Sequence, residues 1–193
     1  PKRLRIGYFS SDFRVHSVIY LIADIIDMHD RERFEIYAYS FGPNDNSELR
    51  KRIVNSVDVF RDVKDMGDQD ISILARKDKI DIAIDINGYT KLSRPNIFAY
   101  RAAPIQIHCQ GSANSSGANF IDYVMIDNIR VPEEHDKYWC ESIIRLPFWC
   151  QARYKKSYIS DQLLTRRDMG LTENGFVFCS FNNNYKLSPI EFD

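Results

Sequence analysis

The sequence has no long apolar run, no excess charge of either sign and few cysteines. No stretch approaches the ~20 apolar residues of a membrane-spanning helix, and the opening PKRLRIGYFS lacks the apolar region of a signal peptide. With 26 basic and 27 acidic residues, the net charge of -1 offers no basic field for nucleic acid or for an anionic membrane. We therefore expect a cytoplasmic protein that binds neither nucleic acid nor membrane.

The motifs of the commonest cofactor sites are also missing. Neither GxGxxG nor a P-loop occurs, so the signatures of dinucleotide and ATP binding are absent. The cysteines form no CxxC pair and no metal-binding spacing with histidine. We expect them to be buried, reduced thiols rather than a disulfide framework. They are Cys109, Cys140, Cys150 and Cys179.

The chain does show a regular alternation of apolar runs and amphipathic segments. Apolar runs predict strands at residues 4–9, 34–41, 57–63, 80–88, 104–111, 120–127 and 142–148. Helical spacing predicts helices at residues 17–30, 47–56, 69–79 and 94–102, the third capped by Asp68. Strands that alternate with helices imply an α/β fold with a parallel sheet and right-handed crossovers.

The pattern changes after residue 150. Residues 1–150 form the predicted α/β domain, and the polar, basic segment 151–174 is typical of a linker. The apolar run GFVFCS, bounded by Gly175, predicts a further strand. Ser188, Pro189 and Glu191 then fit the N-cap, the first position and the capping box of a helix. We expect residues 175–193 to be the start of a second domain, in a chain excised from a longer polypeptide.

Ligands of an open parallel sheet bind beyond the carboxyl ends of its strands. One segment at that edge, SSDFRVHS, contains Asp12 and His16. His16 could act as a general base, because imidazole titrates near pH ~6.5, or it could be a surface or capping residue of a turn. Asp12 could orient that imidazole, although capping the following helix is the simpler interpretation.

Two further features of this edge have competing interpretations. The small-residue loop CQGSANSSG could bring backbone amides close to a ligand, or it could be a flexible turn. Asp12, Asp85 and Asp127 follow predicted strands, but single acidic residues are common there, so we predict no magnesium site. Lys186 directly precedes a predicted helix N-terminus, where it could help to bind a phosphate or could be a solvated loop lysine.

Five ordered stretches carry a family resemblance, and they cover nearly the whole chain apart from the linker. They are RIGYFSSDFRVHSVIYL, FEIYAYSFGPNDNSELR, DINGYTKLSRPNIFAYRAAPIQI, SGANFIDYVMID with VPEEHDKYW, and GFVFCSFNNNYKLSP. In this order they resemble the O-linked N-acetylglucosamine transferase family, and its bacterial members most. The resemblance implies a two-lobed GT-B fold with two Rossmann-like domains, of which residues 1–150 would be the amino-terminal lobe. It also implies transfer of N-acetylglucosamine from UDP-N-acetylglucosamine to Ser or Thr hydroxyls of proteins, with inversion and without metal or cofactor.

The resemblance also implies roles for particular residues of the first domain. Asp12 and His16 match the D-F-x-x-H pair after the first strand, and His16 would lie beside the acceptor hydroxyl and the sugar. Gly111 matches the loop glycine that lies against the sugar. Many members carry tetratricopeptide repeats that hold the protein substrate.

The end of the chain matches the start of the family's carboxy-terminal lobe. Lys186 would stabilise the departing diphosphate, with Asn183 and Tyr185 as polar neighbours. The rest of the nucleotide-binding lobe would follow Asp193, so we expect the isolated chain to be inactive.

The sequence departs from the family in one loop. The family usually has L-G-Y-P-G-T-S-G where this chain has QGSANSSG, from Gln110 to Gly117. Loss of the proline loosens a loop, and loss of a glycine removes backbone freedom. This departure favours an alternative function, a degenerate non-catalytic module that binds a protein partner or a sugar nucleotide, whereas Asp12, His16 and Lys186 favour the enzyme.

Overall fold

The computed structural model describes residues 2–112, 114–147 and 160–191. The chain divides into two compact units, Pro1–Lys156 and Ser157–Asp193. The expected linker lies around this division, and its residues 151–159 fall outside the described ranges.

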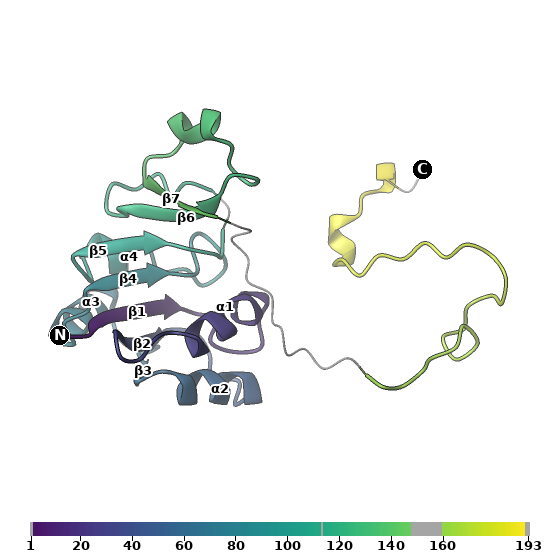
Figure 1. Cartoon of the computed structure of the whole chain (residues 1–193), viewed down its shortest axis with the longest axis horizontal. Coiled ribbons are helices and arrows are strands. Elements are labelled where there is room, and N and C mark those ends of the chain that lie inside the picture. The colour runs from purple at the N-terminus through teal and green to yellow at the C-terminus, as the bar shows by residue number, and fades with distance from the viewer. Residues whose placement is uncertain (1, 113, 148–159, 192–193) are drawn as a thin grey trace. The chain divides into compact units, whose positions relative to one another are not determined.

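The first unit is built on one seven-stranded sheet in which every neighbouring pair of strands is parallel (Figure 1). The order across the sheet is β3-β2-β1-β4-β5-β6-β7. All seven strands predicted for this unit are confirmed. They are β1 (Leu4–Ser10), β2 (Phe34–Ser40), β3 (Val59–Asp62), β4 (Ile82–Asp85), β5 (Ile105–His108), β6 (Tyr123–Asp127) and β7 (Ser142–Leu146).

Helices cover both faces of the sheet, as the nearly unbroken apolar strands predict. On one face α1 (Ser17–Asp27) and α2 (Glu48–Ser56) bury Ile19, Ile22 and Ile53 completely. On the other face α3 (Asp68–Lys77) and α4 (Asn96–Ala99) bury Ile71 and Phe98 against Phe9 and Tyr39. Full burial of one such side chain contributes about 1.5–3 kcal/mol. The two apolar layers therefore fix the sheet and the positions where its strands end.

Two helix predictions need correction. Asp68 is the first residue of α3 rather than its cap; the cap is Gly67, and the Asp68 carboxylate accepts a hydrogen bond from Arg94 at 2.5 Å. The helix expected at residues 94–102 is a single turn, because Arg101 adopts a left-handed backbone conformation at φ 58°. A 3₁₀ helix, Glu133–Tyr138, lies between β6 and β7.

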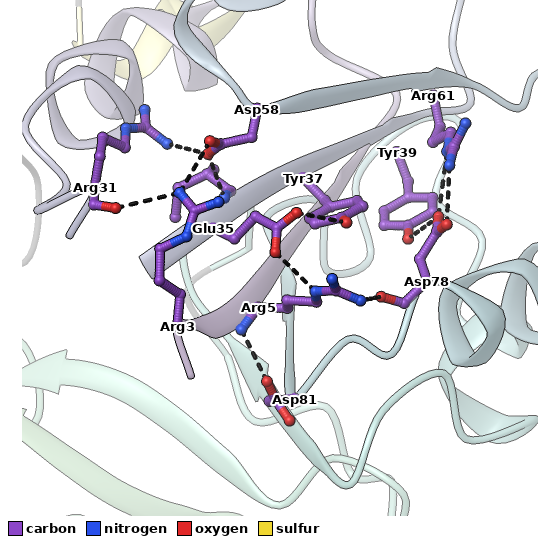
Figure 2. Close-up of polar contacts among 11 residues, drawn as sticks. Arg3, Arg5, Arg31, Glu35, Tyr37, Tyr39, Asp58, Arg61, Asp78 and Asp81 are labelled. Carbon is purple, nitrogen blue, oxygen red and sulfur yellow. Dashed lines mark hydrogen bonds and ion pairs between the residues drawn. The ribbon is translucent and has the colours of Figure 1, made fainter. Parts of the chain in front are cut away.

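The amino ends of the strands are joined by a network of ion pairs (Figure 2). Arg5 of β1 donates to Glu35 of β2 and to the carbonyl oxygen of Asp78, both at 2.8 Å. Asp78 also accepts hydrogen bonds from the Tyr39 hydroxyl at 2.8 Å and from Arg61 at 2.9 Å. The hydrogen bond to Glu35 raises the pKa of Arg5. The charges of this network satisfy one another, and the network ties β1, β2 and β3 to the residues before β4.

The second unit does not contain the predicted strand. Residues 175–180 carry no strand, and the side chains of Phe176 and Phe178 are 83% and 91% exposed. A strand needs a neighbouring strand to pair its backbone groups, and none of the residues described in this unit forms such a strand. Where the capped helix was expected, the structure has one 3₁₀ turn, Pro189–Glu191.

The cysteine prediction is wrong for two of the residues that the structure describes. Cys140 and Cys179 are exposed and Cys109 is half-buried, whereas we expected buried thiols. Cys150 lies outside the described residues.

Candidate functional site

A polar cluster lies at the carboxyl ends of β1 and β4, in the middle of the sheet. The chain proceeds from β1 to β2 and β3 on one side and then returns to β4 on the other side. Such a topological switch point leaves a crevice between the two strand ends, where open α/β sheets bind ligands. Here the residues after β1 and those after β4 meet.

Asn87 joins these two segments and is 1% exposed. Its Oδ1 accepts hydrogen bonds from the Ser10 hydroxyl and the Ser11 backbone N–H, both at 2.8 Å. Its Nδ2 donates to the hydroxyls of Ser11 at 2.9 Å and Thr90 at 3.1 Å. All four hydrogen-bonding positions of the amide are therefore used. We did not single out Asn87 from the sequence; its place directly after a buried strand and before Gly88 was the available signal.

Asp12 and His16 lie together in this cluster, as predicted. Asp12 is 2% exposed, and its Oδ1 accepts hydrogen bonds from Arg14 at 3.0 Å and from the Ser11 hydroxyl at 3.2 Å. Its other oxygen, Oδ2, lies 3.3 Å from Nδ1 of His16. The His16 side chain is 31% exposed. The buried Asp12 carboxylate thus lies next to Nδ1 of His16, and solvent can reach the imidazole ring.

His16 is also the N-cap of α1, which corrects the expectation that Asp12 caps this helix. The His16 Nδ1 lies 3.3 Å from the backbone N–H of Val18 and accepts its hydrogen bond. One nitrogen cannot accept from Val18 and donate to Asp12 at the same time. In the tautomer that donates to Asp12, Nε2 carries a lone pair and can take a proton. The geometry therefore fits both the capping role and the general base.

Gly111 lies against the same cluster and cannot be replaced without strain. Its φ is +77°, and a Cβ there would lie 2.2 Å from the backbone oxygen of Asn87. Gly88 is constrained in the same way, since its φ is +55° and a Cβ there would lie only 2.1 Å from the Ser112 hydroxyl oxygen. The loop after β5 and the turn after β4 are therefore in direct contact. This contact brings Gly111 to the same edge as Asp12 and His16.

The serines of this loop are hydrogen-bonded. Glu141, 5% exposed, accepts from the Ser115 hydroxyl at 2.8 Å and from the Ser116 backbone N–H at 2.5 Å. Although burial opposes the charge, the hydrogen bonds from Ser116 and Ser115 lower the pKa of Glu141. Tyr89 donates its hydroxyl to the Ser116 carbonyl at 2.6 Å and its backbone N–H to the Ser112 hydroxyl at 3.2 Å. Polar contacts thus hold a loop that lacks the family's proline.

The remaining predicted site residues lie in the second unit. Asn183 precedes the 3₁₀ turn Asn184–Lys186, and the backbone N–H of Lys186 donates to the Asn183 carbonyl at 3.0 Å. Tyr185 is 77% exposed and Lys186 is exposed. The structure brings these three residues together within their own unit, and their roles stay predictions.

Two features are absent from the residues that the structure describes. No group of three or more His, Cys, Asp or Glu side chains in the described ranges is placed to hold a metal ion. Among the same residues, no helix has the length and apolar character needed to cross a membrane.

An open parallel α/β sheet with a polar cluster at its switch point defines a Rossmann-like ligand-binding domain. Comparison with known proteins gives the family. Residues 1–152 match the family description Glycosyl transferase family 41, so the chain belongs to this family.

Named relatives and a solved structure agree with this assignment. The chain is 39% identical to a probable UDP-N-acetylglucosamine–peptide N-acetylglucosaminyltransferase, SEC, of Arabidopsis thaliana, over 97% of this chain and 20% of the relative. It is 37% identical to the corresponding transferase of Caenorhabditis elegans, over 98% of this chain and 16% of the relative. A mutant O-GlcNAc transferase of Thermobaculum terrenum matches with a TM-score of 0.75 and 34% identity, over 78% of this chain and 29% of that chain. The chain thus spans about a fifth of the length of these curated relatives.

Proposed function

We propose that the natural protein carrying this sequence is a protein O-GlcNAc transferase of the GT-B type. It transfers N-acetylglucosamine from UDP-N-acetylglucosamine to Ser or Thr hydroxyls of protein or peptide acceptors, with inversion at the anomeric carbon. The observation that carries the proposal is the buried Asp12 carboxylate behind Nδ1 of the accessible His16, at the switch point of a family 41 sheet.

The two residues would act on the acceptor. Nε2 of His16 takes the proton of the acceptor hydroxyl while the hydroxyl oxygen forms the bond to the anomeric carbon. When Nδ1 carries the proton it would donate to Asp12 instead of capping α1, and the carboxylate would then stabilise the imidazolium that forms. General base catalysis of this kind contributes about 10²–10⁴-fold to the rate.

The leaving group needs a positive charge. As the bond from the anomeric carbon to UDP breaks, its electron pair passes to a diphosphate oxygen. Lys186 would stabilise that charge, with Asn183 and Tyr185 as neighbours in the same turn, and this would replace a metal ion. Gly111 would lie against the sugar, where its missing side chain permits close approach. The remaining part of a GT-B catalytic region would complete the nucleotide site.

The alternative is a non-catalytic module of the same fold that binds a sugar nucleotide or a protein partner. The altered loop favours this alternative, since QGSANSSG lacks the proline and one glycine of the family's loop. Asp12 and His16 favour the enzyme, because a binding module needs no general base.

The test is a transfer assay with the natural protein, UDP-N-acetylglucosamine and Ser/Thr peptides, read by mass spectrometry together with calorimetry of UDP binding. We expect peptides that gain one N-acetylhexosamine on a Ser or Thr. UDP-sugar binding without transfer to any peptide or protein acceptor would establish the binding module instead.

A further inference from the structure

A buried histidine lies beneath the loop that carries Gly111, and the mechanism above does not use it. His108 is the last residue of β5 and is 3% exposed. Its Nε2 lies 3.0 Å from the carbonyl oxygen of Ser112. Its Nδ1 lies 3.6 Å from Oδ2 of Asp85, the last residue of β4. Each ring nitrogen therefore faces an oxygen atom.

Both of these oxygens can only accept hydrogen bonds. The Ser112 carbonyl has no hydrogen to give, and the Asp85 carboxylate has none when ionised. A neutral imidazole has one N–H and one lone pair, so either tautomer points a lone pair at an oxygen. The imidazolium has two N–H groups, so it donates to the Ser112 carbonyl through Nε2 and directs its other N–H and its charge toward Asp85, although 3.6 Å is too long for a hydrogen bond. The arrangement therefore fits a protonated ring.

The charges around His108 favour the same state. Burial lowers the pKa of the ring, but the close contact with Asp85 and its negative charge outweigh it. The Ser112 carbonyl and the negative charge of Glu141, which precedes β7, act in the same direction. The net effect raises the pKa of His108 above its ordinary value. Asp85 and Glu141 are the charged groups that face this ring.

Asp85 connects His108 to the candidate site. Its carboxylate also accepts hydrogen bonds from the backbone N–H groups of Asn87 at 2.9 Å and Gly88 at 3.2 Å. Asn87 in turn is hydrogen-bonded to Ser11, which directly precedes Asp12. The His108 ring thus lies between two segments that meet at the site: the turn after β4 and the loop after β5.

We propose that His108 is a positioning residue that acts as an imidazolium between Asp85 and the Ser112 carbonyl. In this state it holds Gly111 against the Asn87–Gly88 turn. This contact sets the affinity of the site for the sugar of its donor. Loss of the Nε2 proton, favoured because the Asp85 carboxylate stabilises the proton on Nδ1, releases Ser112, while Glu141 still holds Ser115 and Ser116. The identification of the ligand as the donor sugar rests on the proposed function, whereas the contact between His108 and the loop after β5 does not.

The direction of the pH dependence follows from the raised pKa of His108. The contact contributes its full stability below pH ~6.5, the ordinary value of a histidine. It is lost as the pH rises through the higher pKa of the folded protein. Loop protection and donor affinity should therefore both decrease as the pH rises above the ordinary titration range of histidine.

Hydrogen exchange measured by mass spectrometry across neutral and mildly alkaline pH tests the loop contact in the natural protein. Wild type should lose protection at the loop after β5, beyond the change in intrinsic exchange, as the pH rises. His108→Gln should abolish this pH dependence, because the glutamine amide can donate to Ser112 but does not titrate. Asp85→Asn removes the facing charge and should move the loss of protection to lower pH.

A second histidine provides the control. His29 lies 2.8 Å from the Tyr8 hydroxyl, and burial with the charge of Arg31 lowers its pKa. His29→Gln should keep the wild-type response of the loop. A wild-type loop whose protection is independent of pH, or a response lost in His29→Gln and kept in His108→Gln, would overturn the proposal.

Kinetics separate this inference from the proposed function. If the protein is a transferase, KM for UDP-N-acetylglucosamine should rise with pH in wild type and stay flat in His108→Gln, with a smaller change in kcat. A loop that responds in a protein without transferase activity would contradict the proposed function and leave the positioning contact standing. A loop that responds while KM does not would contradict the link to the donor sugar.

Discussion

At the scale of single residues, the site depends on backbone contacts that only glycine permits. The loop and the turn touch through Gly111 and Gly88, both in the left-handed region, where other residues cost about 1–3 kcal/mol. The sequence placed Asp12, His16 and Gly111 at one edge because they follow strands. It did not reveal Asn87 or His108, since their importance comes from partners that are distant along the chain.

Gly111→Ala should destabilise the protein more than Gly117→Ala. Both glycines have positive φ, +77° and +63°, but a Cβ at Gly111 would meet the Asn87 backbone whereas nothing lies within 4 Å at Gly117. The difference between the two variants therefore reports the contact alone, and overpacking typically costs about 1–3 kcal/mol. Denaturant unfolding measures it. Equal losses in the two variants would show that the loop does not rest on the turn.

At the scale of elements, apolar periodicity located every strand of the first unit. The order of the strands and the helix ends were harder to predict, because they depend on contacts between elements. Asp68 illustrates this: its sequence position suits a cap, but pairing with Arg94 uses its carboxylate. The run GFVFCS was predicted from its apolar residues alone, and among the residues described in its own unit it has neither a pairing strand nor an apolar cover.

The loop after β5 should depend on the charge of Glu141. Glu141→Gln weakens the hydrogen bonds from Ser115 and Ser116, and hydrogen bonds to charged groups are worth about 1.5–3 kcal/mol. Because the pKa of Glu141 is lowered by folding, this stability is present above the ordinary range of a glutamate and is lost as the pH falls through the folded value.

Unfolding curves at several pH values test this prediction. Glu141→Gln should be less stable than wild type at neutral pH, and the difference should shrink in acid. Glu133→Gln, an exposed glutamate of the 3₁₀ helix Glu133–Tyr138, should stay within about 0.5 kcal/mol of wild type. A difference that does not change with pH would exclude the charge as its cause.

At the scale of the whole molecule, the proposed chemistry needs residues from both units. In the proposal, Asp12 and His16 of the first unit would act on the acceptor, and Lys186 of the second unit would stabilise the leaving group. The sequence predicted these groups mainly through the family resemblance, since a lysine in a short polar turn has no distinctive pattern of its own.

Lys186→Ala should lower kcat by about 10²–10³-fold, because it removes a charge that stabilises the departing diphosphate. Lys186→Arg should restore only part of the rate, since a planar guanidinium replaces a compact charge. Lys77→Ala, at the exposed end of α3, is the matched control and should leave the rate unchanged. Near wild-type kcat/KM in Lys186→Ala would show that Lys186 is an ordinary surface lysine.

The most direct test of the central claim is the rate of sugar transfer by His16→Ala in the natural protein, measured beside UDP affinity. We predict that kcat falls by about 10²–10⁴-fold with little change in UDP binding, because a general base acts mainly in the transition state. His135→Ala, an exposed histidine of the same 3₁₀ helix as Glu133, should keep the wild-type rate. An unchanged kcat in His16→Ala would contradict the account and leave His16 as the cap of α1.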